Sequence, residues 1–335
     1  MLNQFRPRAF RRSLLAWYSA NQRTLPWRAS ADPYRVWLSE IMLQQTRVAA
    51  ALPFYERLLG RFPTVADLAA ATETEVLTYW AGLGYYSRAR NLHAAAKQIT
   101  ARGSFPATFD EILALPGVGE YTAAAIASIA FRLPHAVLDG NVVRVLARLS
   151  GETGDIRSAR VRMRLRGLAA RLLDRSAPGD FNQALMELGA TVCLPGVPDC
   201  ARCPVAIQCA ARAAGCEREL PIISPKPQSS ISRITLLIIR NGERLLLSQR
   251  PDDAGRLAGF WELPDAGRLP HAQILQEIGV FRHTIVSTKY FCRVATGKID
   301  GVNPPGEFVW QPVDELHAIP LSTMTRKALA RLANA

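Results

Sequence analysis

Long apolar runs are absent from this sequence. No stretch of its 335 residues stays apolar over the roughly 18 to 20 positions that a membrane-spanning helix needs. The first 20 residues are basic but have neither a continuous apolar core nor a small-residue cleavage site, so we expect no signal peptide. These absences predict a cytoplasmic protein that has no membrane partner.

Cysteine and lysine are also scarce. Six residues are cysteine and, without an export signal, they do not predict disulfide bonds. Only five of the 41 basic residues are lysines, so arginine carries most of the net charge of +13. Basic residues outnumber acidic ones by 27 to 18 in residues 1–225 and by 14 to 10 in residues 226–335. The surplus favours a polyanionic partner, because neutralised phosphates release counterions; a general bias toward arginine is the alternative explanation.

Composition and periodicity divide the chain into two domains. Residues 1–217 have almost entirely helical spacing, which continues across residues 34–52 behind the cap formed by Asp32 and Pro33. Residues 218–231 contain three prolines and several serines and are typical of a linker. Residues 232–335 predict a small α+β domain with a hairpin at Asn241-Gly242, further strands at 284–295 and 307–313, and a helix at 323–333.

Four cysteines follow the last predicted helix of the first domain. Cys193, Cys200, Cys203 and Cys209 place four thiols in one short loop. Such a set binds either a tetrahedral zinc ion or a 4Fe-4S cluster. Only one pair has the tight two-residue spacer typical of zinc sites, so the spacing favours the 4Fe-4S cluster over zinc and over buried free cysteines.

A single carboxylate interrupts an apolar helical stretch. Glu40 lies among Ile41, Met42 and Leu43, with Gln44 one turn and Arg47 two turns further on the same predicted face. A solvent-exposed polar stripe is one interpretation. A buried carboxylic acid with a raised pKa, able to act as a general acid, is the other.

A second acidic residue follows a glycine-containing turn. Gly117 and Gly119 permit a tight turn in a helical hairpin over about residues 111–131, with backbone N–H groups free to bind phosphate. The segment Asp139-Gly140-Asn141 then opens a predicted helix, VVRVLARL, at residues 142–149. We expect Asp139 to cap that helix, a position that keeps a carboxylate ionised and able to face a developing cation.

These motifs resemble a known family. LPGVG (115–119), LDGNVVRVLAR (138–148) and the four-cysteine loop resemble the helix–hairpin–helix glycosylases, which include endonuclease III. LPWR (25–28), SEIMLQQTRV (39–48), GLGYYSRARNL (82–92) and FNQALMELGATVC (181–193) resemble the MutY family of adenine DNA glycosylases. The resemblance implies a multidomain protein with an all-α helix–hairpin–helix glycosylase domain, a 4Fe-4S cluster loop at 193–209 and a C-terminal α+β Nudix-like domain.

The same resemblance implies catalytic roles. Glu40 protonates adenine at N7 and later handles the attacking water, while Asp139 stabilises the cationic sugar by a covalent adduct or by charge. Asn141 orients the carboxylates. Tyr121 stands where related lyases carry a Schiff-base lysine, and Val143 replaces another lysine of some relatives, so little or no lyase activity is expected.

Binding roles follow in the same way. The residues that line the adenine pocket are Trp27, Arg28 and Gln183. The residues that insert beside the partner base, offsetting the cost of base flipping, are Gln45 and Tyr85. The DNA backbone is bound at Gly117 and Gly119.

The C-terminal segment departs from the family pattern. The Nudix-like domain of MutY proteins recognises 8-oxoguanine opposite adenine, but here the metal-binding carboxylate cluster is reduced to Glu277, so no pyrophosphatase activity is expected. The recognition loop corresponds to residues 282–287, and Val286 and Ser287 replace its Ser–His pair. Ser287 is the remaining candidate for a hydrogen bond to 8-oxoguanine.

The expected function is therefore excision of adenine from double-stranded DNA containing A:8-oxoguanine or A:G, by a monofunctional and monomeric glycosylase. Two alternatives stay open: a sister mismatch glycosylase with another base or partner-base specificity, and a non-catalytic DNA-binding relative.

Overall fold

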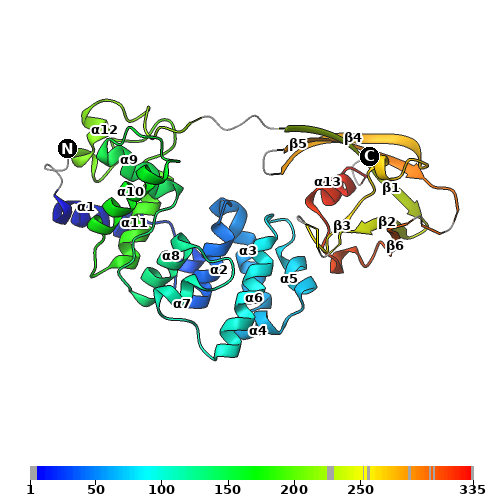
Figure 1. Ribbon diagram of the computed structural model, residues 1–335, viewed down its shortest axis with the longest axis horizontal. Coiled ribbons are helices and arrows are strands. Elements are labelled where there is room, and N and C mark those ends of the chain that lie inside the picture. Colours follow the sequence, from blue (N-terminus) through cyan, green and yellow to red (C-terminus); the bar gives the residue numbers. More distant parts are fainter. Residues whose placement is uncertain are drawn as a thin grey trace. The chain divides into compact units, whose positions relative to one another are not determined.

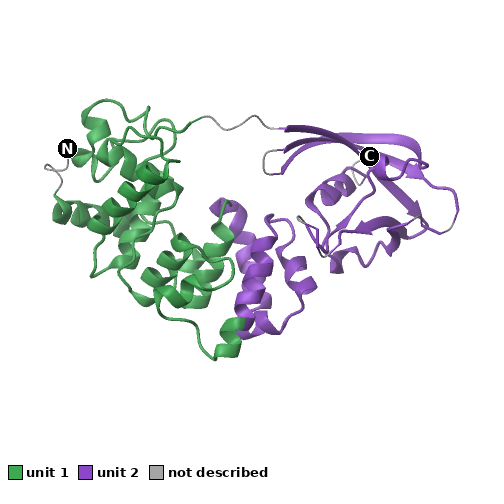
Figure 2. Ribbon diagram, viewed as in Figure 1, with its two compact units in different colours: residues 1–45, 98–225 green, residues 46–97, 226–335 purple. Residues whose placement is uncertain are grey.

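The computed structural model describes residues 6–224, 230–251, 253–254, 257–285, 288–301, 303–304 and 306–332. The chain divides into two compact units, one of residues 1–45 and 98–225, the other of residues 46–97 and 226–335 (Figure 2). The described part of the first unit is helical, whereas the second unit combines helices with a β-sheet (Figure 1). The predicted Ser287, together with Val286, lies outside the described residues.

The first unit contains helices that surround one apolar core. Their bounds are α1 (Pro7–Asn21), η1 (Pro26–Arg28), α2 (Pro33–Leu43), α7 (Phe109–Leu113), α8 (Glu120–Phe131), α9 (Gly140–Ser150), α10 (Ala159–Leu172), α11 (Pro178–Thr191), η2 (Ala206–Gln208) and α12 (Ala210–Ala213). Phe10 of α1 meets Phe181 of α11 edge to face, with 6.2 Å between the ring centroids. Buried side chains of α8, α9, α10 and α11 join the same core, which fixes these helices relative to one another.

Helix α2 begins as the sequence predicts but ends early. The Asp32 carboxylate accepts a hydrogen bond from the backbone N–H of Arg35 (2.9 Å), and Pro33 occupies the first helical position. The helical spacing continues to residue 52, but α2 ends at Leu43 and α3 starts only at Val48. The expectation of one continuous stretch was therefore wrong, because Gln45 takes a left-handed backbone conformation (φ 58°) that stops the helix without glycine or proline.

The hairpin between α7 and α8 is defined by local capping. Thr108 and Glu111 form a reciprocal capping box at the start of α7. Gly117 has φ 75°, a conformation that glycine adopts without steric cost, and Gly119 is the N-cap of α8. The turn therefore leaves the N-terminus of α8 open at its backbone N–H groups.

Helix α11 approaches α9 very closely. A Cβ atom on Gly189 would lie 2.7 Å from the Cβ of Asn141, well inside van der Waals contact. Only glycine allows this approach, which sets the α9 N-terminus against α11.

The second unit begins with α3 (Val48–Arg61), α4 (Val65–Ala70), α5 (Glu73–Trp80) and most of α6 (Ser87–Arg102). Residues 65–84 have continuous helical spacing but form two helices, because Thr72 caps a new helix by accepting from the backbone N–H of Glu75 (3.2 Å). Capping by the Thr72 side chain thus divides the helix here, although the apolar spacing continues through it.

The sheet of the second unit has the order β3-β2-β1-β5-β4, and β6 pairs with β2. Its strands are β1 (Ser230–Asn241), β2 (Arg244–Gln249), β3 (Trp261–Glu262), β4 (Gln273–Ile285), β5 (Thr288–Lys298) and β6 (Phe308–Pro312). Strands β1 and β2 form the predicted antiparallel hairpin, in which Asn241 pairs with Arg244, while β1 and β5 run parallel. The prediction of a single strand at 284–295 was wrong, because these residues belong to two strands. Ile285 ends β4 and pairs with Thr288 of the antiparallel β5.

Both faces of the sheet are covered. On one face Leu236 and Ile238 of β1 pack with buried residues of β2 and of the predicted C-terminal helix, which is α13 (Thr323–Leu332). On the other face Leu237 and Ile239 pack with Phe308 of β6. This alternation explains why β1 has no polar face in its centre. Within the described residues, no helix combines the length and the apolar character that crossing a bilayer requires.

Candidate active site

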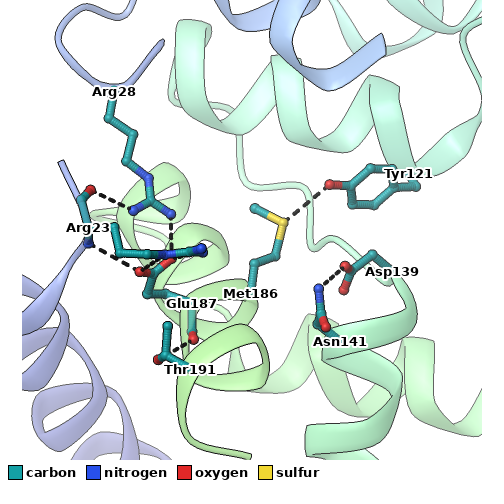
Figure 3. Close-up of polar contacts among 8 residues, drawn as sticks. All are labelled: Arg23, Arg28, Tyr121, Asp139, Asn141, Met186, Glu187 and Thr191. Carbon is teal, nitrogen blue, oxygen red and sulfur yellow. Dashed lines mark hydrogen bonds and ion pairs between the residues drawn. The ribbon is translucent and has the colours of Figure 1, made fainter. Parts of the chain in front are cut away.

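Glu40 is buried, not part of a solvent-exposed stripe. Its side chain points from α2 into the first unit, where the residue is 6% exposed and its Oε2 accepts a hydrogen bond from the Tyr121 hydroxyl (2.8 Å). The stripe interpretation was wrong because α2 ends before Arg47, which belongs to the segment between α2 and α3. The Tyr121 oxygen also lies 3.2 Å from Sδ of Met186 on α11 (Figure 3).

Asp139 caps α9, as predicted, and its carboxylate is shared between two donors. Its Oδ1 accepts from the backbone N–H of Val142 (2.7 Å), and its Oδ2 accepts from Nδ2 of Asn141 (2.9 Å; Figure 3). The Oδ1 of Asn141 accepts in turn from Arg144 (3.0 Å). Asn141 is therefore held at both ends of its amide and fixes the orientation of the Asp139 carboxylate.

The two carboxylic acids influence each other. Burial raises the pKa of Glu40 to about 7; the hydrogen bond from Tyr121 acts against this shift, and the charge of Asp139 adds to it. Burial also raises the pKa of Asp139, against the hydrogen bonds from the α9 backbone and from Asn141. The pKa of Tyr121 is raised well above its usual value by burial and by the charges of Glu40 and Asp139, so its hydroxyl stays protonated beside both acids.

Arg28, a predicted pocket residue, is fixed by a carboxylate that sequence reasoning missed. Glu187 of α11 is fully buried, and its Oε2 accepts from Nη2 of Arg28 (2.8 Å; Figure 3). Arg23 binds the same carboxylate with both Nε (2.6 Å) and Nη2 (2.8 Å). These hydrogen bonds and charges outweigh the effect of burial and hold the pKa of Glu187 at about 2. The charge of Arg28 also reaches Glu40, whose pKa it lowers.

The other predicted pocket residues lie on the same elements. Trp27 is buried in η1, next to Arg28. Gln183 is half-buried on α11, one helical turn before Met186 and Glu187. The spacing of Gln183, Met186 and Glu187 places them on one helix face, and this spacing is the signal that could have identified Met186 and Glu187 from the sequence.

The predicted DNA-contacting residues differ in setting. Gln45 is exposed in its left-handed conformation, and neighbouring Gln44 donates to the hydroxyl oxygen of Thr122 (3.2 Å) in the first turn of α8. Gly117 and Gly119 lie in the α7–α8 turn. Tyr85 belongs to the second unit, where it is 47% exposed.

The cysteine loop is held against α9. Arg144 donates to the carbonyl of Cys193 (2.7 Å), and Arg148 donates to the carbonyl of Leu194 (2.7 Å) and to Sγ of Cys193 (3.3 Å). Among the described residues, no three His, Cys, Asp or Glu side chains are arranged as a complete metal ligand set.

The cysteines nevertheless suit a metal group chemically. Burial raises the pKa of Cys203 to about 11, and the charges of Cys193, Cys209 and Cys200 act in the same direction. The four sulfur atoms thus lie close enough for their charges to interact. A cationic metal group would remove this repulsion and stabilise the thiolates, so the donor set fits a cluster.

The geometry so far defines a class of protein. A buried acid with a raised pKa, an oriented carboxylate and a helical hairpin with open backbone N–H groups suit the cleavage of a glycosidic bond in a nucleic acid. Residues 38–170 match the family model described as HhH-GPD superfamily base excision DNA repair protein. A solved thermostable thymine-DNA glycosylase is 28% identical, has a TM-score of 0.58, and the match covers 64% of this chain and 100% of that chain. The class is therefore that of helix–hairpin–helix base-excision DNA glycosylases.

Curated relatives identify the family within this class. Adenine DNA glycosylase of Homo sapiens is 38% identical, over 95% of this chain and 73% of the human protein. Adenine DNA glycosylase of Rattus norvegicus is 39% identical, over 81% of this chain and 64% of the rat protein. The chain belongs to the adenine DNA glycosylase family, which makes it a DNA N-glycosylase.

Proposed function

We propose that the protein hydrolyses the N-glycosidic bond of adenine opposite 8-oxoguanine or guanine in double-stranded DNA, without significant lyase activity. The observation that carries this proposal is the buried Glu40 carboxyl group, whose pKa is about 7. The charge of the Asp139 carboxylate, which Asn141 orients, contributes to this raised pKa. An acid with this pKa keeps a large protonated fraction near neutral pH and can release its proton to a base.

The chemistry follows from these two groups. Glu40 gives its proton to N7 of the flipped adenine, and the C1′–N9 bond breaks with its electron pair going to the base. Asp139 stabilises the positive charge left on the sugar, by charge or by a transient ester. Water then adds at C1′ and returns a proton to Glu40, which restores the enzyme.

The absence of lysine from the sequence of the first unit supports hydrolysis without lyase chemistry. Lyase activity through a Schiff base needs a lysine amine or an N-terminal amine. Tyr121 presents a phenol to the two acids instead, and residues 1–45 and 98–225 contain no lysine at all. We therefore expect an intact abasic strand as the product.

Several residues are proposed to bind DNA. Arg28, held by Glu187, lines the adenine pocket with Trp27 and Gln183. Gln45 and Tyr85 insert next to the partner base, and the α7–α8 turn with Gly117 and Gly119 binds a phosphate. The C-terminal domain, proposed to be Nudix-like, recognises 8-oxoguanine, with Ser287 as a hydrogen-bonding residue.

Cys193, Cys200, Cys203 and Cys209 are proposed to hold a 4Fe-4S cluster. When bound, the group supplies a cross-link within the loop that Arg144 and Arg148 attach to α9. Purified protein is expected to contain about four irons per chain and to absorb broadly near 400 nm. One zinc per chain in colourless protein would contradict the cluster. The cytoplasmic location and monomeric state stay predictions.

The experiment is a base-release assay with adenine opposite 8-oxoguanine, guanine, cytosine and thymine. We expect free adenine from the first two duplexes, and strand breaks only after alkali treatment. An A:8-oxoguanine duplex left intact by iron-loaded protein would contradict the proposed function.

A second candidate function is that of a sister mismatch glycosylase. It is favoured by the fold similarity to a thymine-DNA glycosylase and by the altered residues 282–287. Preferential release of a base other than adenine from the same panel would support it. Binding of mismatched DNA without release of any base would instead support a non-catalytic relative.

A further inference from the structure

The turn between α5 and α6 holds a strained and exposed tyrosine. Tyr85 has a left-handed backbone conformation (φ 50°), and Gly82 (φ 109°) and Gly84 (φ 80°) flank it. A large aromatic residue rarely adopts this conformation, and it persists only where the surroundings impose it. The residue is nevertheless 47% exposed, so packing of the ring itself does not explain the strain. Strain combined with exposure indicates a residue placed for a partner.

Contacts within the helices restrain the backbone of this turn. Trp80 Nε1 donates to the carbonyl of Gly84 (3.1 Å), and Arg88 donates to the same carbonyl (3.2 Å). The Arg88 guanidinium also lies over the rings of Trp80 (5.3 Å) and Tyr85 (5.4 Å). These contacts fix the C-terminal half of the turn.

The C-terminal domain supplies the remaining contacts. Arg326 of α13 donates from Nη1 to the carbonyl of Ala81 (2.8 Å), at the start of the turn. The ring of Phe260, which is fully buried, packs on the ring of Tyr86 with 4.0 Å between centroids. Arg90 of α6 donates to the carbonyl of Ala258, close to Phe260. The turn that presents Tyr85 is therefore clamped between its own helices and the C-terminal domain, all within one compact unit.

We propose that Arg326 and Phe260 are positioning residues that set the place of Tyr85 against the partner base of the DNA, so that partner-base preference depends on this contact. The proposal rests on the proposed function, because it concerns the reading of the base opposite adenine. An inserted ring can discriminate between partner bases only when its position is fixed, since a mobile ring adapts to either base. The C-terminal domain thereby acts on discrimination through the α5–α6 turn as well as through any direct contact with DNA.

The test is a double-mutant cycle between Arg326→Ala and Tyr85→Ala. Single-turnover adenine release is measured on A:8-oxoguanine and A:G duplexes. The readout is the rate on A:8-oxoguanine divided by the rate on A:G. Loss of one hydrogen bond is expected to lower this ratio about three- to tenfold in the wild-type background. In the Tyr85→Ala background, Arg326→Ala is expected to change the ratio less than twofold, because the positioned side chain is already missing.

Matched variants separate positioning from general destabilisation. Arg331→Ala removes another arginine of α13, whose side chain lies near Gly279 of β4, and is expected to leave the ratio unchanged. Arg326→Lys keeps a donor and is expected to restore part of the ratio. Phe260→Leu keeps an apolar side chain but loses the tilted ring contact with Tyr86, so it is expected to lower the ratio as Arg326→Ala does.

Equal effects of Arg326→Ala in both backgrounds, or an unchanged ratio in the wild-type background, would overturn the proposal while leaving the glycosylase function intact. Failure of the wild-type protein to release adenine would instead contradict the proposed function.

Discussion

Two buried glutamates of the first unit have opposite chemical states. Burial raises the pKa of Glu40 to about 7, and the hydrogen bond from the neutral hydroxyl of Tyr121 is too weak to offset this rise. The pKa of Glu187 is about 2, because Arg23 and Arg28 surround its carboxylate and outweigh the effect of burial. The comparison shows that burial alone does not decide the charge of a carboxyl group; the partners decide it.

The two glutamates therefore affect stability with opposite signs. The pKa of Glu40 is raised in the folded state, so raising the pH from about 4.5 to about 7 costs stability, because the unfolded chain ionises first. The pKa of Glu187 is lowered, so its contribution is present above about 4.5 and is lost as the pH falls toward 2. At neutral pH, the raised pKa of Glu40 therefore lowers the stability of the folded state, whereas the lowered pKa of Glu187 increases it.

The largest expected effect comes from removing the acid. Glu40→Gln and Asp139→Asn should each lower the rate of adenine release about 10²–10⁴-fold, because both keep the shape of the side chain but lose the proton donor or the negative charge. Single-turnover assays measure the rates, and gel-shift titration checks that both variants still bind A:8-oxoguanine DNA. A variant that retains a tenth or more of the wild-type rate contradicts the assigned role.

The next effect concerns the Arg23–Glu187–Arg28 cluster. Glu187→Gln leaves Arg28, whose side chain is 12% exposed, without its charged partner and should destabilise the protein by about 3 kcal/mol. Urea denaturation followed by tryptophan fluorescence measures this change. Glu219→Gln, at an exposed glutamate, is the matched control and should change stability by less than about 0.5 kcal/mol. Equal stability of both variants would show that the cluster is not a structural anchor.

A smaller effect is expected where α11, which carries Glu187, meets the N-terminus of α9. Gly189→Ala adds a Cβ at 2.7 Å from the Cβ of Asn141, so α9 and α11 must separate. We expect a loss of about 1–3 kcal/mol of stability together with slower adenine release, since Asn141 orients Asp139. Gly167→Ala on α10, where the nearest atom is the end of the Arg171 side chain at 3.8 Å, is the control and should be tolerated.

The smallest expected effect is a shift in pH dependence. The hydroxyl of Tyr121 lowers the pKa of Glu40, so Tyr121→Phe should raise that pKa further. The pH above which adenine release declines is expected to move upward by about one unit, the size of one hydrogen bond to a charged group. A downward shift in the pH–rate profile would mean that Tyr121 stabilises the protonated form of Glu40.

The sequence predicted those features that depend on neighbouring residues. The Asp139 cap, the hairpin at Asn241-Gly242 and the capped start of α2 follow from local patterns and are present in the structure. The resemblance of short motifs identified the family, which the relatives confirm.

The features that the sequence did not predict depend on contacts between distant residues, or on a helix end that no glycine or proline marks. Glu187 and Arg23 are 164 residues apart, so nothing local indicates their pairing. The break at Gln45 has neither glycine nor proline to mark it. The contact of Arg326 with Ala81 likewise joins residues 245 positions apart. Tertiary packing decides all three, and a periodic pattern does not contain that information.

The most direct test of Glu40 as the proton donor is the pH dependence of single-turnover adenine release by the wild-type protein from an A:8-oxoguanine duplex. The rate is expected to fall about tenfold per unit above about pH 7, as Glu40 loses its proton, and to fall again at low pH, where the Asp139 carboxylate is protonated. A rate that stays constant up to pH 9, or rises above pH 7, would contradict the role of Glu40 as the buried proton donor.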